Sequence, residues 1–508
     1  MYEENYLAQR LRQNTLNADD KTFLTNSKTG AQKSFGAFFA NTEKVAAALV
    51  ATGLEKGDRV AVQAPKTEAM LELYIATVLV GAIFLPLNTA YTSSEIEYFL
   101  GDAKPRVLVC DPSRLDTLAP IAQGAGVKSV LTLAADETGT LTEARDQQSA
   151  GFIPVPCGAD DLAAILYTSG TTGRSKGAML THKALASNSE ALRDCWQFTE
   201  DDVLIHALPI FHTHGLFVAT NVTLMAGASC IFFGGFDAPA IVKHMPEATV
   251  LMGVPTFYVR LLSEDGLADA AQNMRLFVSG SAPLLAETHQ KWQAKTGHAI
   301  LERYGMTETN MNLSNPYDGE RRAGTVGFPI PGVEVKITNP DNGEDVTQGS
   351  VGMIEVRGPN VFAGYWRMLE KTAEELREDG FFITGDLGMQ DEDGYFHIVG
   401  RNKDLIISGG YNVYPKEVEM VIDDLSGVVE SAVFGVPHPD FGEGVVALVI
   451  AEDDAELDTD WIAQSLSGSL AKFKQPKAIL IAKELPRNAM GKVQKNLLRE
   501  TYKDLFSG

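Results

Sequence analysis

Apolar positions in the first two thirds of the chain alternate between two spacings. Residues 44–53 and 68–81 carry apolar side chains at helical spacing, whereas residues 59–63 (RVAVQ) and 106–111 (RVLVCD) are short apolar runs. The first spacing predicts helices and the second predicts buried strands. The alternation recurs later, where residues 215–225 are predicted to form a helix between two strands. Alternating helices and strands predict an α/β fold with largely parallel sheets.

The pattern changes in the last third of the chain. Residues 332–338, 352–358 and 394–400 are short β-rich segments separated by Gly and Pro, and such segments predict a small β-rich subdomain. Residues 401–508 again alternate strands and helices. We therefore predict an α/β protein in which residues 1–400 form a large N-terminal region of α/β subdomains plus the β-rich subdomain. Residues 401–508 would form a separate, small α+β domain.

Composition excludes several classes of protein. The 508 residues include 43 basic and 66 acidic side chains, which give a formal net charge of −23. So acidic a chain is a poor general binder of nucleic acid or of anionic lipid, and any anionic ligand must be met by a local cluster of donors. The four cysteines show no CxxC spacing, so neither a zinc site nor a redox motif gains support.

One apolar stretch needs a membrane test. Residues 70–87 (MLELYIATVLVGAIFLPL) contain Glu72, Gly81 and Pro86, which favours a buried helix running into a strand over a membrane span. The first residues lack a basic segment followed by an apolar one, so no secretory signal is predicted. We expect a cytoplasmic protein with no membrane span.

The most specific local motif is residues 167–177, YTSGTTGRSKG, directly after an apolar strand pattern. Its glycines allow a tight turn whose backbone N–H groups can approach an anion, and Lys176 adds positive charge. Residues of the motif predicted to bind a nucleotide triphosphate are Thr168, Ser169, Gly170, Thr171, Thr172, Gly173 and Lys176. The motif does not match the Walker A pattern. A flexible surface loop is the alternative that composition alone would permit.

With this loop, further motifs follow in order along the chain: PIFHTHG (209–215), YGMTE (304–308), TGD (384–386), GRNKD (400–404) and PRNAMGK (486–492). Together they resemble the adenylate-forming superfamily of acyl-CoA synthetases, luciferases and adenylation domains, over essentially the full length. The resemblance implies a mobile C-terminal domain with its hinge near Lys403. It also implies ATP, Mg²⁺ and CoA as the small molecules that the protein uses.

The resemblance further implies roles for individual residues. Those expected around the nucleotide are Tyr304 on adenine, Gly305 beside it, Thr307 on the α-phosphate, Asp386 on the ribose hydroxyls and Arg401 on ribose or phosphate. Glu308 and Thr168 would hold Mg²⁺, and both, with Lys492, form the expected catalytic set. Lys492 would enter the active site during adenylation and offset charge between the substrate carboxylate and the α-phosphate. A solvated surface lysine is the alternative for Lys492.

The implied chemistry has two steps. A carboxylate attacks the α-phosphate of ATP and releases pyrophosphate, and the thiol of CoA then displaces AMP to give a thioester. Residues expected along the CoA arm are Gly409, Gly410 and Tyr411. Acetylation of Lys492 would remove its charge, so we add reversible acetylation as a regulatory hypothesis.

The acid is predicted from the segments that line the acyl pocket in this superfamily: residues 206–215, 252–260 and 279–284. Many relatives have Gly where this chain has Arg303, and an unpaired buried guanidinium is costly beside an apolar tail. A second carboxylate would pair it. Residues expected to bind such a substrate are Arg303, Arg260, His212 and Ser281, with His214 as an alternative to His212.

ERYGMTET and PIFHTHG together resemble the malonyl-CoA synthetases, which implies malonate as the dicarboxylate and methylmalonate as a further substrate. Alternatives remain for the individual residues. Arg303 could instead pair with Glu302, Arg260 could lie on a helix surface, and His212 could act sterically. Alternative functions are a ligase for short-chain, medium-chain or aryl monocarboxylates, and a catalytically silent nucleotide-binding protein.

Overall fold

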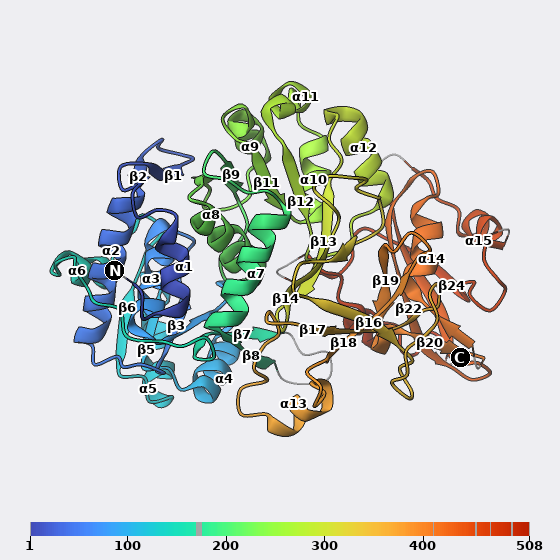
Figure 1. The fold of residues 1–508 in the computed structure, drawn as a ribbon. Coiled ribbons are helices and arrows are strands. Elements are labelled where there is room, and N and C mark those ends of the chain that lie inside the picture. The colour runs from blue at the N-terminus through green and yellow to red at the C-terminus, as the bar shows by residue number, and fades with distance from the viewer. Residues whose placement is uncertain are drawn as a thin grey trace. The chain divides into compact units, whose positions relative to one another are not determined.

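The computed structural model describes residues 2–168, 175–409, 411–452, 455–467, 469–488 and 491–506. The chain divides into two compact units, which are described separately (Figure 1). Unit 1 comprises residues 1–334 and 356–382, and unit 2 comprises residues 335–355 and 383–508. Unit 2 thus contains the β-rich segments as well as residues 401–508. A mobile domain that begins at Arg401, with a hinge near Lys403, stays a prediction.

Among the described residues of unit 1, nine strands form one sheet. They are β1 (Thr22–Asn26), β2 (Gln32–Ser34), β9 (Val203–His206), β10 (Ser229–Phe232), β11 (Val250–Gly253), β12 (Leu276–Ser279), β13 (Leu301–Met306), β14 (Asn310–Ser314) and β15 (Phe328–Pro329). Their order is β15-β14-β13-β12-β11-β9-β10-β1-β2. The pairs from β13 to β1 are parallel, and β2, β14 and β15 add antiparallel edges. The predicted α/β class is confirmed.

A second sheet, with six strands in the described part of unit 1, is formed by residues between β2 and β9. Its strands are β3 (Arg59–Gln63), β4 (Ile83–Pro86), β5 (Val107–Cys110), β6 (Ser129–Thr132), β7 (Leu162–Thr168) and β8 (Lys176–Thr181). The order is β6-β5-β3-β4-β7-β8, and β7 and β8 pair antiparallel. These last two strands flank the predicted phosphate loop.

Helices surround both sheets of unit 1 (Figure 1). They are α1 (Tyr6–Gln13), α2 (Phe35–Ala51), α3 (Glu68–Val80), α4 (Ser93–Ala103), α5 (Leu115–Gly124), α6 (Thr140–Asp146), α7 (His182–Cys195), α8 (Asn221–Ala226), α9 (Ala238–His244), α10 (Pro255–Leu262), α11 (Leu267–Ala270), α12 (Ala286–Thr296) and α13 (Leu369–Glu375). A parallel strand needs a crossover connection to reach its neighbour, and helices supply it here.

Helix α3 shows why residues 70–87 are so apolar. Thr67 caps its start by accepting a hydrogen bond from Met70 N, and Gly81 ends it at φ +73°. The helix is buried on all sides. Its acid Glu72 is also buried and pairs with Lys33 at 2.7 Å and with Arg145 at 3.2 Å. Among the described residues, no helix has both the length and the apolar character needed to cross a bilayer.

The predicted helix over residues 215–225 differs in its first half. Residues His214–Thr220 form a π-helix, which continues into α8. The carbonyl of Gly215 accepts hydrogen bonds from Thr220 Oγ1 at 3.0 Å and from His206 Nε2 at 3.0 Å. These side-chain donors compete for the carbonyl that an α-helix would pair internally, which favours the wider turn.

Unit 2 contains two sheets in its described part. The strands β16 (Glu334–Thr338), β17 (Gly352–Arg357), β18 (Phe382–Gln390) and β19 (Phe396–Arg401) form one in that order, as the β-rich pattern predicts. The other has the order β21-β20-β23-β22 with β24 beside β23; its strands are β20 (Ile406–Ser408), β21 (Tyr411–Val413), β22 (Val428–His438), β23 (Gly442–Ala451) and β24 (Ala478–Ala482).

The helices of unit 2 are α14 (Pro415–Asp423), α15 (Thr459–Ser467) and α16 (Lys495–Thr501) within the described ranges. Apolar residues of α14 and α15 share a buried cluster with β22 and β23, so this sheet has a core of its own.

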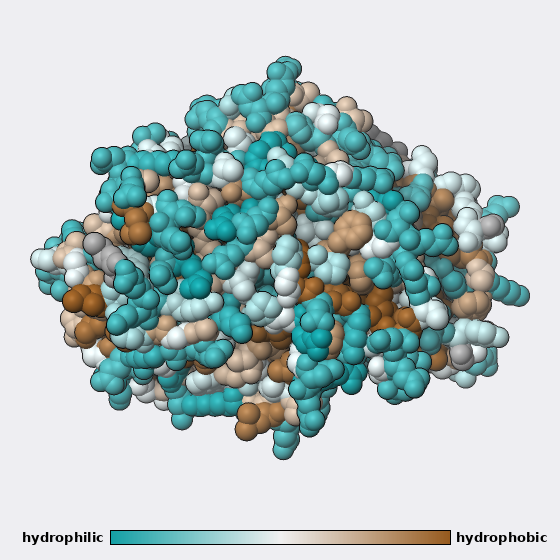
Figure 2. Space-filling view, in the orientation of Figure 1, coloured by the Kyte–Doolittle hydropathy of each residue, from teal (hydrophilic) through white to brown (hydrophobic). Residues whose placement is uncertain are grey.

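Hydrophilic side chains dominate the face of the molecule in Figure 2, in keeping with 66 acidic residues in the chain.

Candidate active site

Four parallel strands of the nine-stranded sheet end at one edge of unit 1. The carboxyl ends of β9, β11, β12 and β13 lie in register there, because β11 pairs with β9 and β12, and β12 pairs with β13. The segments that follow β9, β11 and β12 are the three predicted acyl-pocket segments, and Arg303 lies on β13 directly after Glu302, the last residue that pairs with β12. Ligands of open α/β sheets bind at such an edge.

Arg303 is buried at this edge and is 3% exposed. Within the part of the chain that the structure describes, its Nε and Nη2 have no hydrogen-bond partner. Burial lowers the pKa of Arg303 from 12.5 to about 9, although nearby Tyr258 and Glu302 oppose the change. Glu302 is the next residue on β13, so its side chain leaves the strand on the opposite face. Its Oε1 accepts a hydrogen bond from Leu284 N at 3.0 Å.

His214 lies beside Arg303. It is 3% exposed, and its Nδ1 lies 3.3 Å from Ser281 Oγ. Its Nε2 has no partner among the described residues. Burial lowers the pKa of His214 well below its usual value, and the charge of Arg303 lowers it further. The ring is therefore neutral at physiological pH, and a hydrogen bond from Ser281 to Nδ1 would leave Nε2–H as a donor.

The buried pair of Lys66 and His206 holds the π-helix segment that carries His214. Lys66 Nζ donates to the carbonyl of His206 at 2.8 Å and lies 3.1 Å from His206 Nδ1. Since Nδ1 faces a donor, Nε2 carries the proton and donates to Gly215. The contact anchors the first turn of the π-helix, which carries His214.

The other predicted acid-binding residues lie differently. Arg260 is exposed at the end of α10, with its guanidinium carbon 5.8 Å from the ring centre of Phe236. His212 is half-buried, with its ring 4.8 Å from that of Phe211. Ser281 adopts φ +71°, an uncommon value for a residue other than Gly. Of the predicted set, the structure brings Arg303 and Ser281 together through His214.

A second group of residues joins the phosphate-loop strand to the YGMTE motif. Lys176 Nζ lies 3.2 Å from both carboxylate oxygens of Glu375. The Tyr365 hydroxyl is 2.6 Å from Glu375 Oε2 and 3.1 Å from Glu308 Oε1. Lys176 also lies over the Tyr365 ring, 4.0 Å from its centre. Two predicted nucleotide-site residues, Lys176 and Glu308, are therefore linked through Tyr365 and Glu375.

Sequence reasoning missed Tyr365 and Glu375, because no motif spacing connects them with Glu308.

Burial alone would raise the pKa of Glu375, but hydrogen bonds from Tyr365 and Lys371 and the charge of Lys176 lower it. Burial and the two carboxylates raise the pKa of Tyr365. The phenol has one proton, so it can donate to only one of the two acids at a time.

The turn between β13 and β14 holds the rest of the YGMTE motif. Tyr304 and Thr307 are half-buried, and Glu308 is 5% exposed. The turn is fixed by Asn360, whose side chain donates to Thr309 O at 2.6 Å. Gly305 is needed here because a Cβ would lie 2.0 Å from the carbonyl oxygen of Asn310.

On the neighbouring strand pair, Thr168 ends β7 and its Oγ1 reaches the carbonyl of Lys176 at 3.5 Å. The other predicted loop residues, Ser169, Gly170, Thr171, Thr172 and Gly173, lie outside the described residues, so their contact with a triphosphate stays a prediction. So does the role of Gly410, which also lies outside them.

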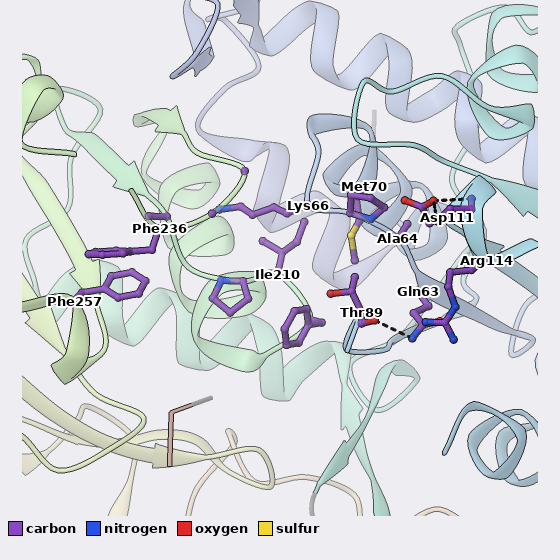
Figure 3. A pocket seen from close by; sticks show the side chains of 17 residues that line it. Gln63, Ala64, Lys66, Met70, Thr89, Asp111, Arg114, Ile210, Phe236 and Phe257 are labelled. Atoms are coloured by element: carbon purple, nitrogen blue, oxygen red, sulfur yellow. Dashed lines mark hydrogen bonds between the residues drawn. The ribbon is translucent and has the colours of Figure 1, made fainter. Parts of the chain in front are cut away.

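Unit 1 also contains a cavity of about 590 Å³ that sequence reasoning missed (Figure 3). It lies where several parallel strands end, and none of the predicted site residues lines it. Asp111 and Arg114 line one end, whereas Phe236 and Phe257 stack at the other with ring centres 4.1 Å apart. The lining comes from segments scattered over residues 63–257. Two of the predicted acyl-pocket segments contribute to it, through Pro209, Ile210 and Phe211 of the PIFHTHG motif and through Phe257, whereas no motif connects the rest.

In unit 2 the predicted ribose residues pair with each other. Asp386 on β18 lies opposite Arg401 on β19, and Arg401 Nε is 2.7 Å from Asp386 Oδ1. Asp386 is 5% exposed. The adjacent Lys403 lies exposed in a short 3₁₀ turn, Asn402–Asp404.

The described members of the predicted CoA and catalytic residues in unit 2 are Gly409, Tyr411 and Lys492. Gly409 adopts φ +61°, and its N–H donates to the carbonyl of Phe441 at 2.8 Å. Tyr411 is 59% exposed and stacks on Phe473 with ring centres 4.7 Å apart. Lys492 is exposed, and its backbone N–H donates to Asn488 Oδ1 at 3.0 Å. The side chain of Asn488 thus fixes the backbone of Lys492 by a hydrogen bond.

Comparison with known proteins matches both parts of the chain. Residues 11–366 match the family described as AMP-binding enzyme, and residues 417–492 match the AMP-binding enzyme C-terminal domain. The chain belongs to the AMP-binding enzyme family. The expected acyl-CoA ligase class and the large and small α/β parts are thereby confirmed.

Several relatives of this AMP-binding enzyme are similar over most of their length. A malonate–CoA ligase of Arabidopsis thaliana is 36% identical over 485 residues, which cover 89% of this chain and 79% of the relative. A feruloyl-CoA synthase of Amycolatopsis is 35% identical, with 93% and 94% covered. The crystal structure of ATP-bound MatB from Rhodopseudomonas palustris is 58% identical, covers 99% of this chain and 100% of its own, and has a TM-score of 0.97.

The residues of this AMP-binding enzyme fit Mg²⁺ as a partner of ATP. Among the described residues no group of three or more His, Cys, Asp or Glu could hold a metal ion alone. Mg²⁺ commonly binds through one or two carboxylates together with substrate phosphates. Glu308 supplies one buried carboxylate, and Thr168 a hydroxyl, so a metal arriving with ATP suits the donor set.

Proposed function

We propose that this protein is an ATP-dependent ligase that joins malonate to CoA through a malonyl adenylate and releases AMP and pyrophosphate. One observation carries the choice of acid: Arg303 is buried at the strand-end edge with Nε and Nη2 unpartnered among the described residues. Methylmalonate, with the same pair of carboxylates, is proposed as a second substrate.

The position of the two N–H donors on the guanidinium supports this acid. Nε–H and one Nη2–H face the same edge of the planar group, so a single carboxylate can accept both in parallel hydrogen bonds. An uncompensated buried charge costs several kcal/mol, on the order of 3–5 kcal/mol where its partner is missing. A dicarboxylate offsets that cost with its second carboxylate, while an apolar monocarboxylate leaves it in place.

The first carboxylate reacts. One of its oxygens attacks the α-phosphorus of ATP, the bond to the bridging oxygen breaks, and pyrophosphate leaves with that electron pair. The CoA thiolate then attacks the acyl carbon, the bond to the AMP oxygen breaks, and malonyl-CoA and AMP result. AMP is the better leaving group, since the direct displacement of oxide from a carboxylate is not feasible.

The site residues have separate proposed tasks. Tyr304 stacks on adenine, Thr307 contacts the α-phosphate, and the Asp386–Arg401 pair receives the ribose. Glu308 and Thr168 would hold Mg²⁺, which supplies positive charge beside the phosphates. Lys492 offsets charge at the α-phosphate during the first step.

Several further properties belong to the same proposal. Residues 401–508 move about a hinge near Lys403 between the two steps, and Gly409, Gly410 and Tyr411 then border the CoA arm. Reversible acetylation of Lys492 would switch adenylation off. We place the protein in the cytoplasm and expect it to have no nucleic-acid partner.

A substrate panel tests the proposal. Pyrophosphate release is measured with malonate, methylmalonate, acetate, butyrate, octanoate and benzoate, and malonate is expected to give the highest kcat/KM. Arg303→Ala should lower kcat/KM for malonate by about 100-fold or more, as expected when one partner of a buried charge pair is removed, and change butyrate little. Arg260→Ala is the matched exposed control and tests the other arginine. Equal loss of malonate and butyrate activity in Arg303→Ala would contradict the proposal.

A further inference from the structure

The residue beneath the Arg303 guanidinium is Gly280, which follows β12. A Cβ built on Gly280 would lie 2.4 Å from Arg303 Cζ, 2.5 Å from Nε and 2.7 Å from Nη1. These distances are far below van der Waals contact, so the guanidinium occupies the space that any side chain at position 280 would need. The guanidinium therefore lies directly over the Cα of Gly280, on the side where a side chain would project.

The backbone itself does not require glycine at this position. Gly280 is absent from the residues with positive φ, whereas the adjacent Ser281 has φ +71°. Its N–H faces the carbonyl of Gly253 at 3.3 Å, which continues the pairing of β12 with β11. An alanine could adopt this conformation, and the three nearest atoms that its Cβ would meet all belong to the Arg303 side chain.

We propose that Gly280 is a specificity-determining residue. Because it has no side chain, it leaves the space in which Arg303 is held in place for the second carboxylate. This inference rests on the proposed function. Arg303 then lies beside His214, and Ser281 Oγ is 3.3 Å from His214 Nδ1. Arg303 Nε, Arg303 Nη2 and His214 Nε2 are buried nitrogens without hydrogen-bond partners among the described residues.

The consequence of a larger residue follows from which atoms can move. The atoms that a Cβ would meet belong to the far end of a flexible side chain, so the guanidinium yields and the strand does not. Gly280→Ala should therefore fold with Arg303 displaced. The distal carboxylate would lose its parallel pair of hydrogen bonds, while the first carboxylate and ATP would react as before.

The test measures kcat/KM for malonate and for propionate, in which a methyl group replaces the second carboxylate. Gly280→Ala is expected to lower malonate kcat/KM by about 100-fold and to change propionate by less than about threefold. The control, Gly101→Ala, lies on α4, where a Cβ meets nothing within 4 Å, and should match the wild type with both acids. A malonate kcat/KM within threefold of wild type in Gly280→Ala would overturn the proposal.

A double-mutant cycle identifies the cause. In an Arg303→Ala background, Gly280→Ala should bring no further loss, because the atoms it displaces are gone. An equal loss in both backgrounds would mean a backbone effect and would also overturn the proposal.

A crystal structure of Gly280→Ala separates this idea from the proposed function. The guanidinium should leave its wild-type position whichever acid the enzyme prefers. If the guanidinium stays in place and the strand shifts instead, the proposed role of Gly280 is wrong. If the guanidinium moves but wild type shows no preference for malonate over propionate, the proposed substrate is wrong. The proposed role of Gly280 in holding Arg303 then still stands.

Discussion

Replacing Arg303 by methionine should make the free enzyme more stable and at the same time inactive with malonate. Methionine fills a similar volume without charge. The pKa of Arg303 falls from 12.5 to about 9 because the charged form is buried. For a base, a lower pKa in the folded state means that folding disfavours the charged form, and this cost is fully present at every pH below about 9.

The magnitude follows from the same values. At about 1.4 kcal/mol for each tenfold change in acidity, the change in pKa limits the cost to about 5 kcal/mol. Replacing buried ionic groups by apolar residues of similar size gains about 1–4 kcal/mol where it has been measured, so we expect about 2 kcal/mol. For a protein of this size that raises Tm by about 2–4 °C.

Thermal unfolding at pH 7.5 without substrate measures the effect. Arg275→Met is the matched control, because Arg275 is also partly buried but has partners: Asp202 at 2.6 Å and the carbonyls of Trp196 and Gln197 at 3.1 Å each. Its loss should lower Tm, since Asp202 would be left unpaired. If Arg303→Met also lowered Tm by more than 2 °C, Arg303 would be a structural residue and the reasoning on the substrate would fail.

Two further predictions concern the nucleotide half of the reaction. Lys492→Gln, which mimics acetylation, should slow pyrophosphate exchange by about 100-fold and leave thioester formation from preformed malonyl adenylate unchanged. The exposed Lys483→Gln is the control. Normal exchange in Lys492→Gln would contradict the proposed role of Lys492 in adenylation. Glu375→Gln should lower the KM for ATP about threefold to fivefold, because Lys176 no longer has to leave a partly exposed ion pair worth about 1 kcal/mol; a raised KM would instead show that Glu375 holds Lys176 ready for phosphate.

Local patterns predicted the elements well where burial follows spacing. The strand over residues 59–63 is observed with the same bounds, and the helix over 68–81 ends within one residue of its prediction. The helix predicted over 44–53 instead begins at Phe35, because Ser34 caps it and Phe35, Phe38 and Phe39 are buried in the first turns. That burial is tertiary, so the spacing of residues 44–53 could not reveal it.

The site was predictable only where a motif carries its residues. Arg303 stands beside the YGMTE motif, and its burial could be inferred from that place. Tyr365 and Glu375 could not be found, because they reach Glu308 and Lys176 through the fold and not through spacing. Gly280 could not be found from the sequence either. Its proposed role depends on the side chain of Arg303, which is 23 positions away and reaches it across neighbouring strand ends.

The relatives at 35–36% identity do not by themselves select the acid, so the residues of the pocket carry a separate argument. Relatives that share 35–36% identity with this chain include both a malonate–CoA ligase and a feruloyl-CoA synthase, whose acids differ in size and charge. The backbone at the strand ends can therefore serve either. What distinguishes the acids physically is the residue at the pocket wall: a buried guanidinium with two parallel donors favours a second carboxylate and disfavours an aromatic ring by leaving those donors unpaired. On the proposed function and the proposed role of Gly280, substrate choice in this chain would depend on whether position 280 leaves room for the arginine at position 303.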